Sequence, residues 1–235
     1  MKFLLYADVH LGRYIEHYEM GVLKCYDFDK LPKYLDKLSI LNTIAESEHV
    51  DQIINLGDTF DILDLSGYEG GEYYRKWLER NSSLLGIYEK NITKIKSVFK
   101  NHVMIRGNND PRNLPKHWGI NLVISPAEFL NDYLLLSFSK YESDRPDLSM
   151  YTRKYKACFA HWYNGLVSQV DTDKIFFGHF HERQFPKTRV GKRYIVGAFS
   201  DSSTYPGFII YNDSDNTITE YDLNGRRKNL VRCLR

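Results

Sequence analysis

Five short apolar segments in this chain are each followed directly by residues that can bind a metal ion. The segments are KFLLYA, QIINL, HVMIR, KACFA and KIFF, and they begin at residues 2, 52, 102, 156 and 174. Apolar runs of this length, bounded by glycine and polar residues, are typical of buried β-strands. Ligand sites in open α/β sheets gather outside the carboxyl ends of the strands. The sequence therefore predicts an α/β fold that brings these strand ends to one edge.

The side chains that follow these segments are two aspartates, one asparagine and four histidines. They are Asp8, His10, Asp58, Asn108, His161, His179 and His181. Imidazole and carboxylate ligands suit zinc, manganese, iron or nickel better than calcium, which prefers oxygen ligands alone. Seven ligands are too many for one ion and are about right for two, if one carboxylate bridges the pair. We therefore expect a dinuclear site, whose ions would clamp the attacking and leaving oxygens of a phosphoryl transfer.

The secondary structure of the rest of the chain is predicted from the spacing of its apolar residues. Helical spacing of apolar residues predicts a helix over 32–45 and a long helical stretch over 72–99, which Asn81-Ser82-Ser83 breaks into two helices. Short β-rich runs predict a mixed or antiparallel set of strands at 174–177, 193–196, 207–211 and 217–222. Loops are expected at 12–30, 62–75 and 139–154, and the basic C-terminal stretch from Arg226 is expected to be a solvated tail.

Length and composition limit the class of protein. The 235 residues are expected to form a single domain, 1–235, with a helical elaboration around 62–100. The formal net charge of +2 gives no basic excess of the kind that marks nucleic-acid-binding proteins. Three widely spaced cysteines argue against a disulfide framework and fit a reducing cytosol. No apolar stretch reaches the length of a membrane span, so we expect a cytoplasmic protein without a membrane partner, and a homodimer is compatible with the aromatic content.

The blocks after the strands resemble the pattern of the calcineurin-like metallophosphoesterase superfamily. That pattern is D-x-H, G-D-x-x-D, G-N-[H/C/R/D]-[D/E], H and G-H-x-H. In this chain it reads Asp8-Val9-His10, Gly57-Asp58-Thr59-Phe60-Asp61, Gly107-Asn108-Asn109-Asp110, His161 and Gly178-His179-Phe180-His181, in the family's order. Each block alone is a weak signal, whereas the ordered set is specific. The resemblance implies two mixed β-sheets packed as a sandwich and flanked by α-helices.

The resemblance also implies roles for the individual residues. One ion would be held by Asp8, His10, Asp58 and His181, and a second ion by Asp58, Asn108, His161 and His179. Asp58 would bridge the two ions, and Asp61 would orient a ligand without touching metal. Asp58, Asn108 and His161 are the expected catalytic residues, and a metal-bound hydroxide would attack phosphorus. Manganese is the expected metal, with iron, zinc, nickel or cobalt as alternatives.

Asn109 departs from the pattern of many family members. Those members have a histidine at this position, which protonates the leaving oxygen, and asparagine cannot donate a proton in that way. The acid is therefore either absent or supplied by a neighbour such as His117. A substrate with a good leaving group would need no acid, and the first hypothesis is a phosphodiester of a nucleotide or nucleic acid. Asn109, Arg112 and His117 are the candidate substrate-binding residues, and Asp110 is expected to have a structural role.

Three further functions remain open at this point. The blocks also resemble the nuclease subunits of double-strand-break repair complexes, which would make the chain a DNA exonuclease or endonuclease. Nucleotide or lipid pyrophosphatases share a residue other than histidine in the third block. A non-catalytic scaffold for a protein partner is the alternative from a different class, although such scaffolds usually lose metal ligands. The small bacterial phosphodiesterases of the superfamily are the nearest in pattern, since they share the short spacing from His161 to His179.

Overall fold

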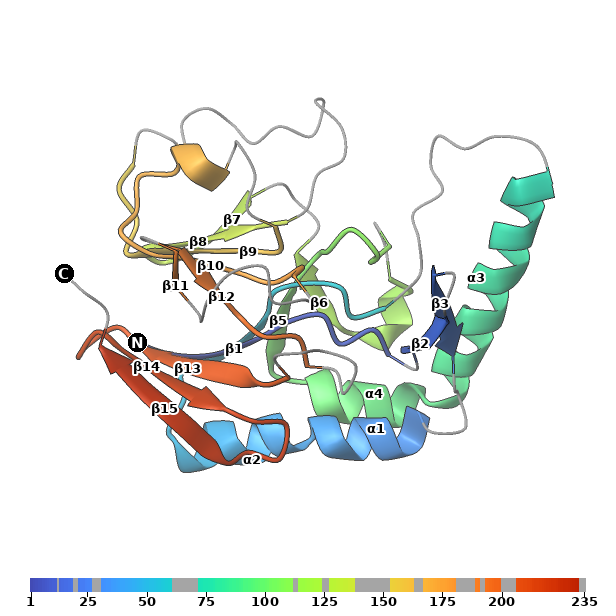
Figure 1. Ribbon diagram of the computed structural model, residues 1–235, viewed down its shortest axis with the longest axis horizontal. Coiled ribbons are helices and arrows are strands. Elements are labelled where there is room, and N and C mark those ends of the chain that lie inside the picture. The colour runs from blue at the N-terminus through green and yellow to red at the C-terminus, as the bar shows by residue number, and fades with distance from the viewer. Residues whose placement is uncertain are drawn as a thin grey trace.

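Two β-sheets stacked face to face, with α-helices on one side, form the molecule in the computed structural model (Figure 1). The structure describes residues 1–11, 13–18, 21–26, 31–60, 72–111, 114–123, 127–137, 153–162, 167–180, 189–190, 193–199 and 206–232. These two sheets confirm the predicted α/β sandwich fold.

The first sheet has seven strands. Their order is β15 (Arg227–Arg232), β14 (Thr217–Tyr221), β13 (Phe208–Asn212), β1 (Lys2–Tyr6), β4 (Gln52–Asn55), β5 (His102–Ile105) and β6 (Asn121–Val123). Strands β1, β4, β5 and β6 are parallel, whereas β13, β14 and β15 extend the sheet as an antiparallel ladder next to β1. The parallel pairing brings the carboxyl ends of β1, β4 and β5 to one edge, as the sequence predicted.

The second sheet has six strands. Their order is β11 (Arg189–Val190), β12 (Arg193–Ile195), β10 (Ile175–Phe177), β9 (Ala157–Ala160), β8 (Tyr133–Leu136) and β7 (Ala127–Leu130). The four central strands are parallel, and β11 and β7 add antiparallel edges. The strands predicted after His161 therefore divide between the sheets, because β10 and β12 join this sheet while β13 and β14 join the first.

The helices pack on the outer side of the first sheet, except that the long helix over 72–90 rises along one end of the molecule (Figure 1). They are α1 (Leu31–Leu38), α2 (Ile40–Ser47), α3 (Glu72–Lys90) and α4 (Ile92–Phe99), and two 3-10 turns follow at Lys116–Trp118 and Val167–Gln169. Strand β1 is buried on both faces. Its Leu4 and Tyr6 pack against the helices, while Phe3 and Leu5 pack against the second sheet. Burial on both faces explains why β1 is a continuous apolar run rather than an alternating one.

The sequence-based prediction of where the long helical stretch breaks is wrong. The break in the 72–99 helical stretch lies at Asn91 and not at Asn81-Ser82-Ser83. Helix α3 continues through these residues, and the Ser83 hydroxyl donates to the carbonyl of Glu79 one turn earlier (3.0 Å), so it does not compete with the helix. At Asn91 the backbone N–H donates instead to Tyr88, three residues back, which ends the α-helical ladder.

Two segments predicted to be irregular contain strands. Within 12–30, β2 (Arg13–Tyr18) and β3 (Gly21–Tyr26) pair as an antiparallel hairpin separate from both sheets. The basic C-terminal stretch forms β15, which pairs with β14 at the edge of the first sheet, instead of a solvated tail. The loops predicted at 62–75 and 139–154 lie mostly outside the described residues.

Candidate metal centre

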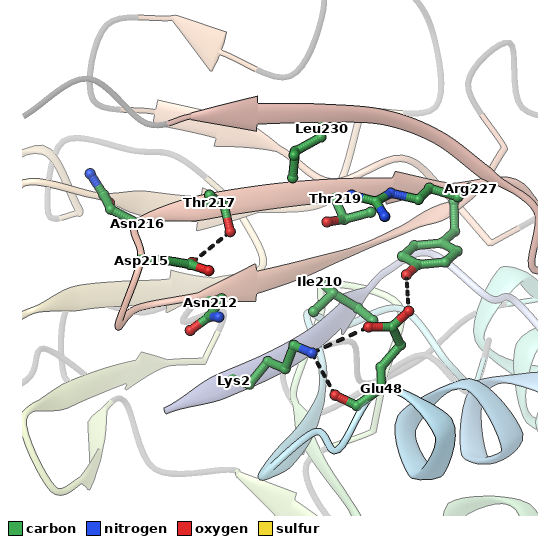
Figure 2. A pocket seen from close by; sticks show the side chains of 11 residues that line it. Lys2, Glu48, Ile210, Asn212, Asp215, Asn216, Thr217, Thr219, Arg227 and Leu230 are labelled. Atoms are coloured by element: carbon green, nitrogen blue, oxygen red, sulfur yellow. Dashed lines mark hydrogen bonds and ion pairs between the residues drawn. The ribbon is translucent and has the colours of Figure 1, made fainter.

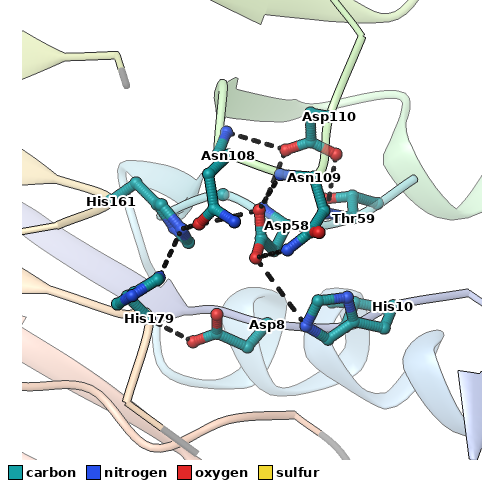
Figure 3. Close-up of polar contacts among 12 residues, drawn as sticks. Asp8, His10, Asp58, Thr59, Asn108, Asn109, Asp110, His161 and His179 are labelled. Carbon is teal, nitrogen blue, oxygen red and sulfur yellow. Dashed lines mark hydrogen bonds and ion pairs between the residues drawn. The ribbon is translucent and has the colours of Figure 1, made fainter. Parts of the chain in front are cut away.

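The predicted metal ligands follow strands of both sheets at one edge of the sandwich. Asp8 and His10 follow β1, Asp58 follows β4, Asn108 follows β5, His161 follows β9 and His179 follows β10. The two sheets are joined at this edge, since the backbone N–H of His179 donates to Asp8 Oδ2 over 2.8 Å. The six side chains point toward a common centre (Figure 3).

Asp58 lies between two groups of ligand atoms. One group consists of Asp8, His10 and Asp58, and the other of Asp58, His161 and His179; within each group the candidate ligand atoms lie within 4.8 Å of one another. Oδ2 of Asp58 is 3.8 Å from Nε2 of His10, and Oδ1 is 3.5 Å from Nε2 of His161. The two oxygens of one buried carboxylate therefore face histidines of different groups.

The protonation of His161 follows from its contacts. Its Nδ1 lies 2.9 Å from the carbonyl oxygen of Leu56, and because a carbonyl only accepts, Nδ1 carries the proton. In the neutral ring Nε2 then presents a lone pair toward Oδ1 of Asn108 at 2.8 Å and Nδ1 of His179 at 3.2 Å. An amide oxygen and two imidazole nitrogens that converge in this way form a donor set that suits a transition-metal cation.

Burial and mutual charge set the electrostatics of the centre. Burial raises the pKa of Asp8 to about 6, and the charge of Asp58 adds to this rise. Burial also acts to raise the pKa of Asp58. His161, His10 and the hydrogen bonds from Asn109 outweigh burial and hold this pKa below its ordinary value. Burial, together with His161, lowers the pKa of His179 to about 4. Two closely packed buried carboxylates fit divalent cations, which would compensate their negative charge.

The backbone carries the ligands in an unusual conformation. Asp8, His10, Asp58 and His179 have φ values of 53°, 44°, 57° and 72°. Such left-handed conformations cost roughly 1–3 kcal/mol each and persist only where the surroundings enforce them. Here the N–H groups of Asp8 and His10 donate to the carbonyls of Gly57 and Asp58, both over 2.9 Å. These bonds tie the loop after β1 to the loop after β4.

Two helices anchor the loop after β1 from the other side. The hydroxyl of Tyr34 in α1 donates to the carbonyl of Val9 over 3.1 Å, and that of Tyr88 in α3 donates to the carbonyl of Leu11 over 3.0 Å. Both tyrosines lie within the stretches 32–45 and 72–99, whose apolar spacing predicted helices. Their position in those helices is what the periodicity predicts, whereas the hydroxyl partners depend on tertiary structure.

The Asp110 carboxylate organises the loops that carry Asp58 and Asn108. Its Oδ2 accepts from the backbone N–H groups of Asp58 (2.7 Å) and Gly107 (2.8 Å). Its Oδ1 accepts from those of Thr59 (2.8 Å) and Phe60 (2.7 Å). Burial and the charge of Asp58 nevertheless raise the pKa of Asp110 to about 6. Asp110 has the structural role predicted for it, and that role is to hold two loops together.

The glycines of the blocks allow the ligands to approach the backbone. A Cβ on Gly57 would lie 2.5 Å from Nδ1 of His161, and a Cβ on Gly107 would overlap with the carboxylate and backbone N of Asp58. Gly57 also has a φ of 110°, which residues with side chains rarely adopt. These two positions therefore require glycine because of the ligand side chains themselves.

The predicted substrate-binding residues are placed unequally. Asn109 lies at the centre, where its side-chain N–H donates to Asp58. His117 is 63% exposed and its Nε2 lies 2.8 Å from Glu89 of α3, so its substrate role remains a prediction. His181, Arg112 and Asp61 lie outside the described residues. Sequence reasoning did not single out Trp162, whose only signal was its position directly after His161.

A separate pocket of about 620 Å³ lies near the amino-terminal end of β1, away from the ligand cluster at its carboxyl end (Figure 2). Two of its charged groups, Lys2 and Glu48, pair at 3.2 Å, and the Tyr221 hydroxyl donates to Glu48 over 2.8 Å. Both metal-ligand groups of the described residues lie elsewhere. We therefore assign the chemistry to the strand-end cluster.

The model of the calcineurin-like phosphoesterase family matches residues 1–201 of this sequence. The chain belongs to that family. Membership confirms the resemblance of the sequence blocks, and together with the Asp/His groups it supports a metal-dependent phosphoesterase. A search of curated proteins finds no match. Among the described residues, no helix is long and apolar enough to pass through a membrane.

Solved structures similar to this chain have low sequence identity to it. A dimetal phosphatase from Danio rerio superposes with a TM-score of 0.50 at 10% identity, covering 93% of this chain and 94% of its own. A phosphoesterase from E. coli, YfcE, gives 0.47 at 13% identity and covers 99% of both chains. The Pseudomonas putida nuclease MPE gives 0.39 at 19% identity, covering 90% of this chain and 84% of its own. At 10% identity, the similarity to the Danio rerio phosphatase concerns the fold alone.

Proposed function

We propose that this chain is a phosphodiesterase that acts on nucleotides or nucleic acid with the help of two divalent metal ions. The observation that carries the proposal is the position of Asp58, whose Oδ2 faces His10 and whose Oδ1 faces His161. A carboxylate shared by two ligand groups is the arrangement that a bridging ligand requires. Manganese is the proposed metal, and iron, zinc, nickel or cobalt would suit the same ligands.

The candidate ligands that the structure describes fall into two sets, one for each ion. Asp8, His10 and Asp58 would hold one ion, with His181 as a further ligand that lies outside the described residues. Asp58, His161 and His179 would hold the other, with the oxygen of Asn108 beside them. Divalent ions in such a centre lower the pKa of water at the site and neutralise charge that develops on the phosphoryl oxygens.

The surrounding residues of the chain hold these ligands in place. The Leu56 carbonyl fixes the tautomer of His161 so that Nε2 faces the centre. The N–H of His179 orients Asp8, and Asn109 orients Asp58. The four N–H groups that bind Asp110 keep the two central loops in register. Such supporting contacts typically change metal affinity or activity 10- to 100-fold, to an order of magnitude, when they are removed.

Preference for a diester follows from Asn109. The amide stands where many family members have a proton-donating histidine, and here its N–H is bonded to Asp58 Oδ2. It therefore positions a ligand and supplies no proton to a leaving alkoxide. A stable oxyanion leaves without such an acid, whereas the sugar alkoxide that leaves from a nucleotide or nucleic-acid diester would need the charge stabilisation that two divalent ions supply to a leaving oxygen.

A direct test compares two substrates with the same leaving group. Metal-stripped protein reloaded with manganese is assayed on bis-p-nitrophenyl phosphate and on p-nitrophenyl phosphate. We expect a higher kcat/KM for the diester. A higher value for the monoester would overturn the diester assignment and direct the search to nucleotide and protein phosphates. Absence of turnover on both, with manganese bound, would favour a non-catalytic scaffold.

The role of Asp58 is tested by Asp58→Asn. This change removes the shared negative charge while it keeps the size of the side chain, so turnover should fall to background and manganese binding should weaken. Asp132→Asn is the matched control, because Asp132 is a half-exposed carboxylate whose ion pairs within the described part of the chain are with Arg153 and Lys156. Unchanged activity of Asp58→Asn would rule out the two-metal mechanism.

We also propose a cytoplasmic location. Cys158 is a free thiol buried in the second sheet, which fits a reducing compartment. We further propose that two copies of the chain form a homodimer. Sedimentation of the purified chain checks this proposal.

A further inference from the structure

Trp162 is an exposed aromatic side chain beside the metal centre. Among the described residues, the large hydrophobic side chains that are exposed are Trp162 at 39% and Leu230 at 55%. Trp162 directly follows His161, which is completely buried. It belongs to none of the three hydrophobic clusters in the described part of the chain. Its ring therefore lies outside the described core, and its exposed part is accessible to a ligand.

The indole is held against a candidate metal ligand. Its ring stacks on that of His179, with centroids 4.9 Å apart and planes 25° apart. Phe180 approaches the same imidazole edge-on, with centroids 5.4 Å apart and planes 81° apart. His179 in turn lies edge-on to His161 at 5.1 Å. Trp162 thus stands one ring beyond the centre, in a fixed orientation.

A partly exposed indole at this distance suits a flat apolar group of the substrate. In a nucleotide the base is one sugar away from its phosphate, so a phosphate at the ligand cluster can place its base near Trp162. Stacking of a base on an aromatic side chain contributes about 1–3 kcal/mol and does not depend on sequence. Indole is the largest of the aromatic side chains and loses little conformational entropy on binding.

We propose that Trp162 is the base-stacking residue of this site, and that the substrate is a nucleotide or single-stranded phosphodiester whose base packs on the indole. This inference rests on the proposed function and narrows its substrate class. A base within a duplex is already stacked and must be extruded before it can reach a side chain. The formal net charge of +2 shows no overall basic excess that would favour a long polyanionic backbone. Both arguments favour short or unpaired substrates.

The test compares ligands that differ by the base alone. Affinities for AMP and for ribose 5-phosphate are measured by calorimetry on the manganese-loaded protein, its Trp162→Ala and Trp162→Phe variants, and the control Leu230→Ala. We expect the preference for AMP, given as the ratio of the two Kd values, to fall about 5- to 150-fold in Trp162→Ala, which is 1–3 kcal/mol converted at 1.4 kcal/mol per factor of ten. Trp162→Phe should retain most of the preference, and Leu230→Ala should retain all of it.

A kinetic version separates this inference from the proposed function. Thymidine 5′-(p-nitrophenyl phosphate) and methyl p-nitrophenyl phosphate share a leaving group and differ in the nucleoside. The ratio of their kcat/KM values should fall in Trp162→Ala by the same factor as the binding ratio. If Trp162→Ala lowers the affinity or the kcat/KM equally for both members of a pair, the indole only supports His179 and the inference is overturned. If base-dependent binding is present but neither ester is hydrolysed, the inference stands and the proposed phosphodiesterase activity fails.

Discussion

Asn109 donates two hydrogen bonds to the carboxylate of Asp58, from its backbone N–H to Oδ1 over 2.8 Å and from Nδ2 to Oδ2 over 2.6 Å. Both oxygens of the central carboxylate are therefore oriented by one residue. A histidine at position 109 would keep the backbone bond but replace the amide donor with an imidazole that can titrate. The identity of residue 109 thus links the geometry of the centre to the supply of a proton.

We predict that Asn109→His raises activity on substrates with poor leaving groups. A positioned general acid contributes about 10²–10⁴-fold, so kcat/KM for an alkyl phosphate should rise about tenfold or more relative to that for a p-nitrophenyl ester. Asn109→Ala, which removes the amide without adding an acid, is the control and should lower activity on both. The absence of a relative gain in Asn109→His would mean that another residue already protonates the leaving group.

Asp110→Asn should destabilise the protein and loosen the centre. One of the two oxygens that accept backbone N–H groups would become an NH₂ facing two of those donors. Loss of two hydrogen bonds to a charged group predicts a loss of about 3 kcal/mol in the free energy of unfolding, measured by urea titration. Asp222→Asn is the matched control, because Asp222 accepts two backbone N–H groups through Oδ1 alone, in an exposed turn. Equal effects of the two changes would contradict the organising role of Asp110.

Much of the fold could be predicted because the central strands are buried on both faces. Strands such as β1 and β9 consist almost entirely of apolar residues, and this pattern is visible without any alignment. Strand β15 was missed because residues 226–230 are exposed, so no buried face marks it as a strand. It is held by its ladder to β14, which is a long-range contact. The hairpin β2–β3 likewise belongs to neither large sheet.

The candidate ligands could be predicted because residue type and position after a strand both indicate metal binding. The hydrogen bonds that hold these ligands in place could not be predicted. The partners of Asp110 lie about fifty positions away along the chain for Asp58, Thr59 and Phe60, and only the paired strands bring them together. Trp162 was not predicted to be a site residue for a related reason, since an aromatic residue after a strand is usually part of a core. Its exposure is a property of the folded molecule.

Gly107→Ala should weaken metal binding, whereas Gly86→Ala should stabilise the protein. A methyl group on Gly107 would overlap with Asp58, and forcing it in costs about 1–3 kcal/mol of stability while it displaces a ligand. Gly86 lies inside α3 with nothing within 4 Å of an added Cβ, so alanine there should contribute about 0.5–1 kcal/mol. Thermal unfolding and manganese titration of both variants provide the measurement. A Gly107→Ala protein with normal manganese affinity would contradict the close approach of Asp58.

A series of buried hydrogen bonds around His102 lies behind the metal centre. Asn42 donates to the carbonyl of Val98 over 2.9 Å, which leaves its Oδ1 to accept from Nε2 of His102 over 2.9 Å. His102 therefore accepts from the Tyr6 hydroxyl at Nδ1 over 2.7 Å and is neutral. Tyr6 is also bonded to Asn55, which contacts the Asp58 loop through the N–H of Gly57 over 2.7 Å.

Burial lowers the pKa of His102 from 6.5 to about 3, so the unfolded chain binds a proton that the folded chain refuses between these values. The contribution of His102 to stability is then fully present above pH 6.5 and is lost as the pH falls toward 3. The slope is about 1.4 kcal/mol per pH unit, to an order of magnitude. Urea unfolding at pH 7, 6 and 5 should show this loss in the native protein and in the exposed-histidine control His49→Gln, but not in His102→Gln. If the three proteins lose stability in parallel as the pH falls, His102 is not neutral in the folded chain.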